Sequence, residues 1–295
     1  MTMVSIVFDI THTTTYRYAR PVKLGEHRVM FRPRDSHDLR VLATDLEVSP
    51  PAQDIRMIMD VYSNSVAIVK PADEAQELRF VCTFTVEHTG SRALDLPVDP
   101  HARLYPFTYS GEDQIALAPY LPAFYPAEQA RLKTWAQGFL DEGGGQTDSR
   151  EVLVRMNKAI RENMSYQVRH EEGVQSPGET LDKGSGTCRD FATLMIEAAR
   201  ALGYAARFVS GYVYGAELEQ ADSAGATHAW LQVYLPGAGW IPFDPTNDLI
   251  GGHELIRVGV ARHASLASPL SGTWTGAPAD YLGMTVDVQV RKRSG

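Results

Sequence analysis

The chain has 295 residues, of which 44% are hydrophobic and 22% charged, as in ordinary globular proteins. It carries 28 Lys and Arg against 36 Asp and Glu, which gives a net charge of −8. This acidic balance argues against a nucleic-acid partner, because binding a polyanion needs clustered cations. The two cysteines, Cys82 and Cys188, exclude a disulfide framework and a cysteine-rich zinc site.

The first residues have no early positive charge and no long apolar run, so they do not form a signal peptide. The longest stretch without a charged side chain, residues 223–243, contains His228, Pro236 and several glycines, which excludes an apolar membrane-spanning helix. We therefore expect a cytoplasmic protein that has no membrane partner.

The first hundred residues have the pattern of short β-strands. Ile6, Phe8 and Ile10 alternate with polar neighbours, and further β-type runs follow, separated by turn-forming clusters, at residues 40–48, 55–60, 65–70 and 78–87. Regularly spaced strands without helices predict an antiparallel β-sandwich. Cys82 lies within the last of these runs, so we expect it to be a packed or half-buried strand residue.

Residues 97–126 are rich in proline and predict an extended linker, after which the hydrophobic periodicity becomes helical. One helix is expected over about residues 127–140. Another begins near Asp148 or Ser149, where apolar side chains recur every four residues.

The most informative helix is predicted to begin at Thr187 or Cys188. Its apolar residues form one stripe, Thr187 is a suitable N-cap, and Gly203 is suitable for the residue after the last turn. Strands follow at residues 205–214, 227–235 and 239–243, and residues 284–290 alternate like a strand with no identifiable partner.

Cys188 is a candidate nucleophile because it stands at the start of this helix. A reference thiol with a pKa near 8.5 is only about 3% ionised at pH 7. The helix dipole stabilises an anion by roughly 0.3–1 kcal/mol, which is too little for full ionisation. A protonated imidazole beside the sulfur would supply the rest.

His228 is the candidate imidazole and Asp244 its candidate acceptor. Ala229, Leu231, Val233 and Leu235 form the apolar face of the strand, so His228 shares the other face with Trp230, Gln232 and Tyr234, which we interpret as a groove wall. Asp244 ends the next strand, and an even register would place it on the same face as His228.

Each residue also has an ordinary structural interpretation. A single cysteine at a helix start is more often structural, a single strand histidine usually lies on the surface, and Asp-Pro is usually a turn. The combination of all three at these positions favours a Cys-His-Asp acyl-transfer site. The other histidines lack partners at metal-ligand spacing, and no dinucleotide loop or serine nucleophile elbow is present, so we expect no metal and no cofactor.

The motifs around these residues strongly resemble the transglutaminase-like superfamily, and most closely its bacterial members with a β-rich N-terminal region. The resemblance covers residues 186–192 and 201–212, the triplet His228-Ala229-Trp230, and residues 240–247. It implies a papain-like α+β core over residues 126–262, preceded by a β-sandwich region and linker over 1–125. A C-terminal extension over 263–295 would end in a strand.

The resemblance also implies functional roles. Cys188 would be the nucleophile, His228 the general base and acid, and Asp244 the residue that orients the histidine. Tyr166 is the candidate aromatic donor to the oxyanion, and Tyr212 and Trp230 are candidate groove-lining residues. Calcium sites of animal transglutaminases lie outside the matching stretches.

These roles imply a thioester enzyme that acts on peptide or carboxamide bonds of a peptide or protein substrate. Resolution of the thioester by water would make it a protease or amidase, which we favour, and resolution by an amine would make it a cross-linking transamidase. The alternative of another class is a binding module with an inactive core. The oligomeric state does not follow from the sequence.

Overall fold

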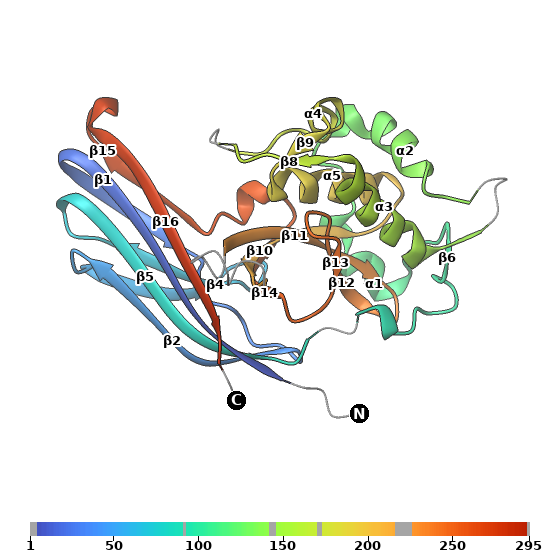
Figure 1. Ribbon diagram of the computed structural model, residues 1–295, viewed down its shortest axis with the longest axis horizontal. Coiled ribbons are helices and arrows are strands. Elements are labelled where there is room, and N and C mark those ends of the chain that lie inside the picture. Colours follow the sequence, from blue (N-terminus) through green and yellow to red (C-terminus); the bar gives the residue numbers. More distant parts are fainter. Residues whose placement is uncertain (1–4, 91–92, 142–145, 170–172, 216–225, 294–295) are drawn as a thin grey trace.

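The computed structural model describes residues 5–90, 93–141, 146–169, 173–215 and 226–293. An antiparallel β-sheet of long, curved strands lies beside a region in which helices cover a smaller sheet (Figure 1). The predicted α+β fold with an antiparallel N-terminal β region is therefore confirmed. Among the described residues, no helix is both long and apolar enough to cross a bilayer.

The larger sheet has seven strands within the described residues, in the order β2-β5-β1-β4-β3, with β15 and β16 also paired to β1. Its strands are β1 (Ile6–Val29), β2 (Leu39–Ser49), β3 (Asp54–Met59), β4 (Ser65–Lys70), β5 (Glu74–His88), β15 (Leu270–Thr275) and β16 (Tyr281–Lys292).

Strand β1 joins the parts of this sheet. Its first half pairs with β5 and β16, and its second half pairs with β4 and β15. The register shifts between Arg17 and Val22, where the strand changes partners. The strands that we predicted as a sandwich thus belong to one continuous curved sheet, because this 24-residue strand runs through both parts.

The C-terminal strand, whose partner the sequence did not identify, lies beside the first strand of the chain (Figure 1). Its register runs from Phe8 paired with Lys292 to Tyr18 paired with Tyr281. At the open end, Arg293 makes an ion pair with Asp9 at 2.6 Å. The predicted 263–295 extension therefore completes the N-terminal sheet, while the predicted domain boundaries stay predictions.

The smaller sheet has the strand order β13-β12-β11-β10-β14. Its strands are β10 (Ala206–Val213), β11 (Ala226–Leu235), β12 (Gly239–Asp244), β13 (Leu249–Ile250) and β14 (Leu255–Ala261). The helices around it are α1 (Gly111–Ala116), α2 (Gln129–Gln137), α3 (Ser149–Asn163), α4 (Pro177–Lys183) and α5 (Cys188–Ala201).

Two short strand pairs complete this region. They are the antiparallel pair β6 (Leu104–Tyr105) and β7 (Thr147–Asp148), and the parallel pair β8 (Ser165–Tyr166) and β9 (Ser185–Gly186). The predicted proline-rich linker is not fully extended, because it contains α1 and the 3-10 turn Ala118–Tyr120.

Helix α5 begins and ends where its sequence predicts. Thr187 has extended backbone angles before the first turn, and Gly203 adopts the positive φ of 93° that favours glycine. The predicted apolar stripe is buried: Phe191, Leu194, Met195, Ala198 and Leu202 all belong to the main hydrophobic core. This packing holds the N-terminus of α5, and with it Cys188, against the sheet.

Candidate active site

The nucleophile candidate Cys188 is the first residue of α5. The end of the helix is fixed by Asp190, whose Oδ2 accepts hydrogen bonds from the Thr187 backbone N–H at 2.8 Å and from the Thr187 hydroxyl at 2.9 Å. Cys188 is the first helical residue, and the first N–H groups of a helix have no acceptor within it, so the Cys188 N–H can bind an anion.

The register of the smaller sheet places His228 and Asp244 on the same face. Gln232 pairs with Pro242 and Tyr234 pairs with Trp240, so even-numbered residues of both strands share one side. The proline does not interrupt the pairing. His228 Nε2 and Asp244 Oδ2 are 2.8 Å apart, the contact that an even register predicts.

Asp244 is fully buried and accepts three hydrogen bonds. Besides the histidine, Asn247 Nδ2 donates to Oδ2 at 2.7 Å, and the Thr246 backbone N–H donates to Oδ1 at 3.0 Å. Donors on both oxygens hold the carboxylate in one orientation. Because the Asp244 carboxylate binds Nε2 of His228, the other ring nitrogen, Nδ1, remains available to the sulfur.

Cys188 and His228 line the same pocket, and the sulfur interacts with the imidazole. Burial alone would lower the pKa of His228, but the charge of Asp244, its hydrogen bond and the interaction with Cys188 outweigh burial and raise this pKa to about 10. The imidazole is therefore protonated at neutral pH and lies between a carboxylate and a sulfur. This is the arrangement that stabilises a thiolate.

A pocket of about 710 Å³ opens beside this pair, and both parts of the fold line it. The core contributes Tyr166, Val168, Arg169, Cys188, Arg189 and His228 to the wall of this pocket. The larger sheet contributes His12, Thr14, Leu270, Met284 and Val286, and Phe31 joins them from just beyond the end of β1. The N-terminal sheet and the C-terminal strand thus form part of the same pocket as the sulfur.

Tyr166 lies at the mouth of this pocket with 53% of its surface exposed. Strand β8 pairs with β9, which ends two residues before Cys188, and this places Tyr166 opposite Gly186. Burial and the charge of Cys188 raise the pKa of Tyr166, so the phenol is protonated at neutral pH. A protonated phenol can donate a hydrogen bond to a developing oxyanion.

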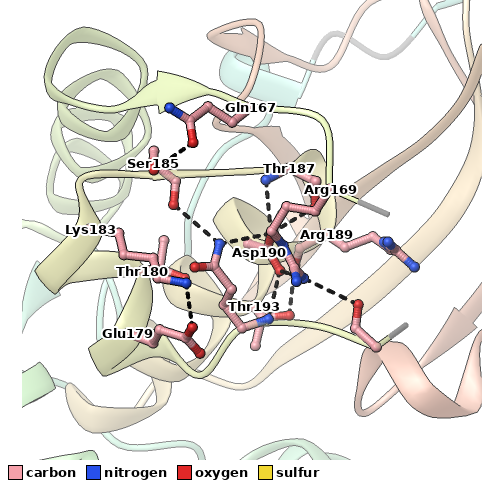
Figure 2. Close-up of polar contacts among 12 residues, drawn as sticks. Gln167, Arg169, Glu179, Thr180, Lys183, Ser185, Thr187, Arg189, Asp190 and Thr193 are labelled. Carbon is pink, nitrogen blue, oxygen red and sulfur yellow. Dashed lines mark hydrogen bonds and ion pairs between the residues drawn. The ribbon is translucent and has the colours of Figure 1, made fainter. Parts of the chain in front are cut away.

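Figure 2 shows the polar cluster around Asp190, close to the start of α5. The fully buried Asp190 accepts hydrogen bonds from Arg169 Nε and Nη2, both at 3.0 Å, and from Gln175 N at 2.8 Å. Burial alone would raise the pKa of Asp190, but the bonds from Arg169, Thr187 and Gln175 lower it to about 2. One carboxylate thereby connects the loop before α4 to the start of α5.

Comparison with known proteins agrees with this geometry. A model of the transglutaminase-like superfamily core matches residues 134–245, and a model of the bacterial transglutaminase-like N-terminal region matches residues 8–87. The chain is a member of the transglutaminase-like superfamily. The match to the core includes Cys188, His228 and Asp244.

Relatives that match nearly the whole transglutaminase-like chain have no described activity. An uncharacterised protein of Mycobacterium tuberculosis is 27% identical over 297 residues, which cover 95% of this chain and 92% of the relative. A protein-glutamine gamma-glutamyltransferase of Pseudomonas aeruginosa is 39% identical over 71 residues, which are 22% of this chain and 10% of that protein.

A crystal structure of a proposed cysteine protease from Cytophaga hutchinsonii has the same fold. It aligns with a TM-score of 0.71 and 20% identity over 99% of this chain and 93% of that one. The transglutaminase-like core and its N-terminal β region therefore occur together in both proteins.

The two predicted groove-lining residues of this transglutaminase-like core do not line the described pocket. Trp230 is 1% exposed and packs with Val209, Val213, Leu255 and Val260 in a second hydrophobic cluster. Tyr212 is 2% exposed and lies behind His12, with its hydroxyl 2.8 Å from His12 Nδ1. The predicted groove wall is wrong because that face of β11 is covered by other parts of the protein.

Sequence reasoning missed the pocket residues outside the core. His12 stacks on Phe31 at 3.9 Å, and His263 stacks on Phe124 at 3.6 Å. Burial lowers the pKa of both histidines to about 4, so both rings are neutral at pH 7. No motif marks these positions: His12 lies in β1, far from Cys188 in the sequence, and His263 lies in the segment after β14.

Within the part of the chain that the structure describes, no three His, Cys, Asp or Glu side chains come together as a metal-binding group. No residue is therefore assigned to a metal, and the absence of a cofactor stays a prediction.

Proposed function

We propose that the protein is a cysteine hydrolase that cleaves peptide or carboxamide bonds through a thioester. The observation that carries the proposal is that Cys188 and His228 line one pocket, with His228 Nε2 2.8 Å from the buried Asp244. A nucleophile, a base and an orienting carboxylate in this order have the arrangement that acyl transfer needs.

In the proposed first step, the Cys188 thiolate attacks the carbonyl carbon of the substrate. The C–N bond breaks while the His228 imidazolium gives its proton to the leaving amine, and a thioester forms. Asp244 holds the ring in orientation and balances its charge throughout. The Cys188 backbone N–H and the Tyr166 hydroxyl stabilise the oxyanion.

In the second step, water attacks the thioester and His228 accepts its proton. The carboxylic acid product leaves and the thiolate is restored. Water access supports hydrolysis over transamidation, because the pocket includes Tyr166 and Val168, which are 53% and 71% exposed.

Transamidation is the second candidate. One observation favours it, namely the local similarity of the core to the gamma-glutamyltransferase of Pseudomonas aeruginosa. In that reaction a primary amine, rather than water, attacks the same thioester.

The test uses a peptide library with a labelled primary amine, incubated with wild-type protein, Cys188→Ala and Cys82→Ala. Cleaved peptides, deamidated glutamines and amine adducts differ in mass, so mass spectrometry separates protease, deamidase and transamidase. We expect cleavage or deamidation that is lost in Cys188→Ala and kept in Cys82→Ala. Dominant amine adducts would favour the transamidase.

Alkylation tests the remaining alternative, a binding module with an inactive core. Cys82 is 2% exposed, and burial raises its pKa to about 12, so it is an internal reference for an unreactive thiol. Iodoacetamide at neutral pH should modify Cys188 far faster than Cys82. Equal, slow modification of both would overturn the enzyme proposal.

A further inference from the structure

Arg189 follows the nucleophile directly in α5 and is half-buried in the wall of the pocket. Its positive charge acts on Tyr166, lowering the pKa of that phenol against the larger effects of burial and Cys188 that raise it. The guanidinium therefore lies near the groups proposed to hold the reacting carbonyl.

The pocket contains two arginines with different surroundings. Arg169 binds both oxygens of Asp190 at 3.0 Å and is a structural part of the loop. Figure 2 shows the Arg189 side chain directed away from this cluster, with no contact drawn to its guanidinium. Among the described residues, no hydrogen bond or ion pair is made by the Arg189 guanidinium.

Among the described residues of the pocket, the Arg189 guanidinium has no carboxylate partner, and the proposed Cys188 thiolate is the anion beside it. Of the described residues that line it, none is Asp or Glu. His12 and His263 are neutral at pH 7, and the charge of His228 is balanced by Asp244. A guanidinium without a carboxylate partner among the described pocket residues, in a protein with net charge −8, marks a position that selects for an anion.

Guanidinium groups bind carboxylates through two parallel N–H···O bonds, which gives both affinity and orientation. We propose that Arg189 binds a carboxylate of the substrate peptide, so that the enzyme selects amides with an acidic group within about two residues of the attacked bond. This inference rests on the proposed function, since it names the substrate class of the same site.

A different role for Arg189 would be to stabilise the thiolate, because it stands next to the sulfur in sequence. That role predicts slower reaction with every substrate and every alkylating reagent when the charge is removed. A carboxylate-binding role predicts a loss only for anionic reagents and substrates. The two roles are separated by comparing an anionic and a neutral reagent of the same size.

Iodoacetate and iodoacetamide form such a pair. Both alkylate the sulfur with loss of iodide, and they differ in a carboxylate against a carboxamide. In wild-type protein, the ratio of the Cys188 alkylation rates (iodoacetate over iodoacetamide) should exceed that in Arg189→Gln by roughly three- to tenfold, as expected for unit charges about 4 Å apart that are screened by water. Arg161→Gln, which removes an exposed arginine of α3, is the matched control and should keep the wild-type ratio.

The outcomes separate the inference from the proposed function. If neither reagent modifies Cys188 faster than Cys82, the proposed function fails. If both modify Cys188 quickly but Arg189→Gln leaves the ratio unchanged, the function stands and the inference is overturned. A uniform loss of rate for both reagents assigns Arg189 to the thiolate and also overturns it.

Matched peptides identify the source of the carboxylate. One pair carries Glu or Gln beside the amide that is attacked, and another pair has a free or amidated C-terminus at the same distance. Wild-type kcat/KM should favour the acidic member of at least one pair by roughly three- to tenfold, and Arg189→Gln should remove that preference. Equal rates within both pairs in the wild type would overturn the inference.

Discussion

Replacing Asp244 by Asn tests whether the carboxylate keeps His228 protonated. Both oxygens of Asp244 accept hydrogen bonds, from His228 and Asn247 at Oδ2 and from the Thr246 backbone at Oδ1. The amide has nearly the same shape but only one acceptor oxygen and no charge. The substitution therefore leaves one donor unpaired and removes the negative charge that balances the imidazolium.

The expected effect follows from the pKa of His228. The wild-type value is raised to about 10, and without the carboxylate burial lowers it, so the ring loses its proton at pH 7. The sulfur then loses its cationic partner, and a reference thiol without one is about 3% ionised at pH 7. We expect the rate of Cys188 alkylation to fall by about 30-fold at this pH.

The assay measures the iodoacetamide rate by mass spectrometry over a pH series. The wild-type rate should change little between about pH 6 and 8, whereas the Asp244→Asn rate should rise nearly tenfold per pH unit. Asp113→Asn is the control, because it removes a carboxylate that binds Tyr234 at the far end of β11. A flat profile at the wild-type rate in Asp244→Asn would refute the reasoning.

The same substitution links folding to pH. Because the pKa of His228 in the folded protein, about 10, is above the reference value of 6.5, the pair stabilises fully below about pH 6.5. This contribution is lost as the pH rises through about 10. The melting temperature of the wild type should therefore fall more steeply than that of Asp244→Asn between about pH 7 and 10, as measured by calorimetry. A parallel decline in both proteins would contradict this assignment.

Three further substitutions test the surroundings of the site. Asp190→Asn removes the buried carboxylate that pairs with Arg169 and should lower the free energy of unfolding in urea by about 3–5 kcal/mol. A loss below about 1 kcal/mol would contradict a stabilising role for this ion pair. Tyr166→Phe should lower kcat on the order of 100-fold with little change in KM, and an unchanged kcat would exclude the oxyanion role. Gly211→Ala places a Cβ 2.2 Å from the Ile256 carbonyl oxygen and should destabilise the fold by roughly 1–3 kcal/mol in the same urea assay. A variant as stable as the wild type would show that the strands can separate there.

The candidate catalytic residues could be predicted because their signals are local. The start of α5 follows from the apolar period and the capping position of Thr187, which lie within one turn of Cys188. The shared face of His228 and Asp244 follows from strand alternation across a tight turn, which preserves the parity of residue numbers. Neither inference needs knowledge of distant parts of the chain.

The environment of those residues could not be predicted in the same way. Alternation shows that Trp230 shares a face with His228, but it does not show that other strands bury most of that face. Likewise, the hydrogen bond between His12 and Tyr212 joins residues 200 positions apart. Such contacts depend on how the two sheets meet, which no local pattern encodes.

The pairing of β1 with β16 means that one wall of the pocket is made from the part of the chain that is synthesised after the candidate catalytic residues. The ribosome releases Cys188, His228 and Asp244 before β16, which carries two side chains of the pocket wall. During synthesis, these three side chains therefore emerge before one wall of the pocket exists. The pocket is complete only when β16 pairs with β1.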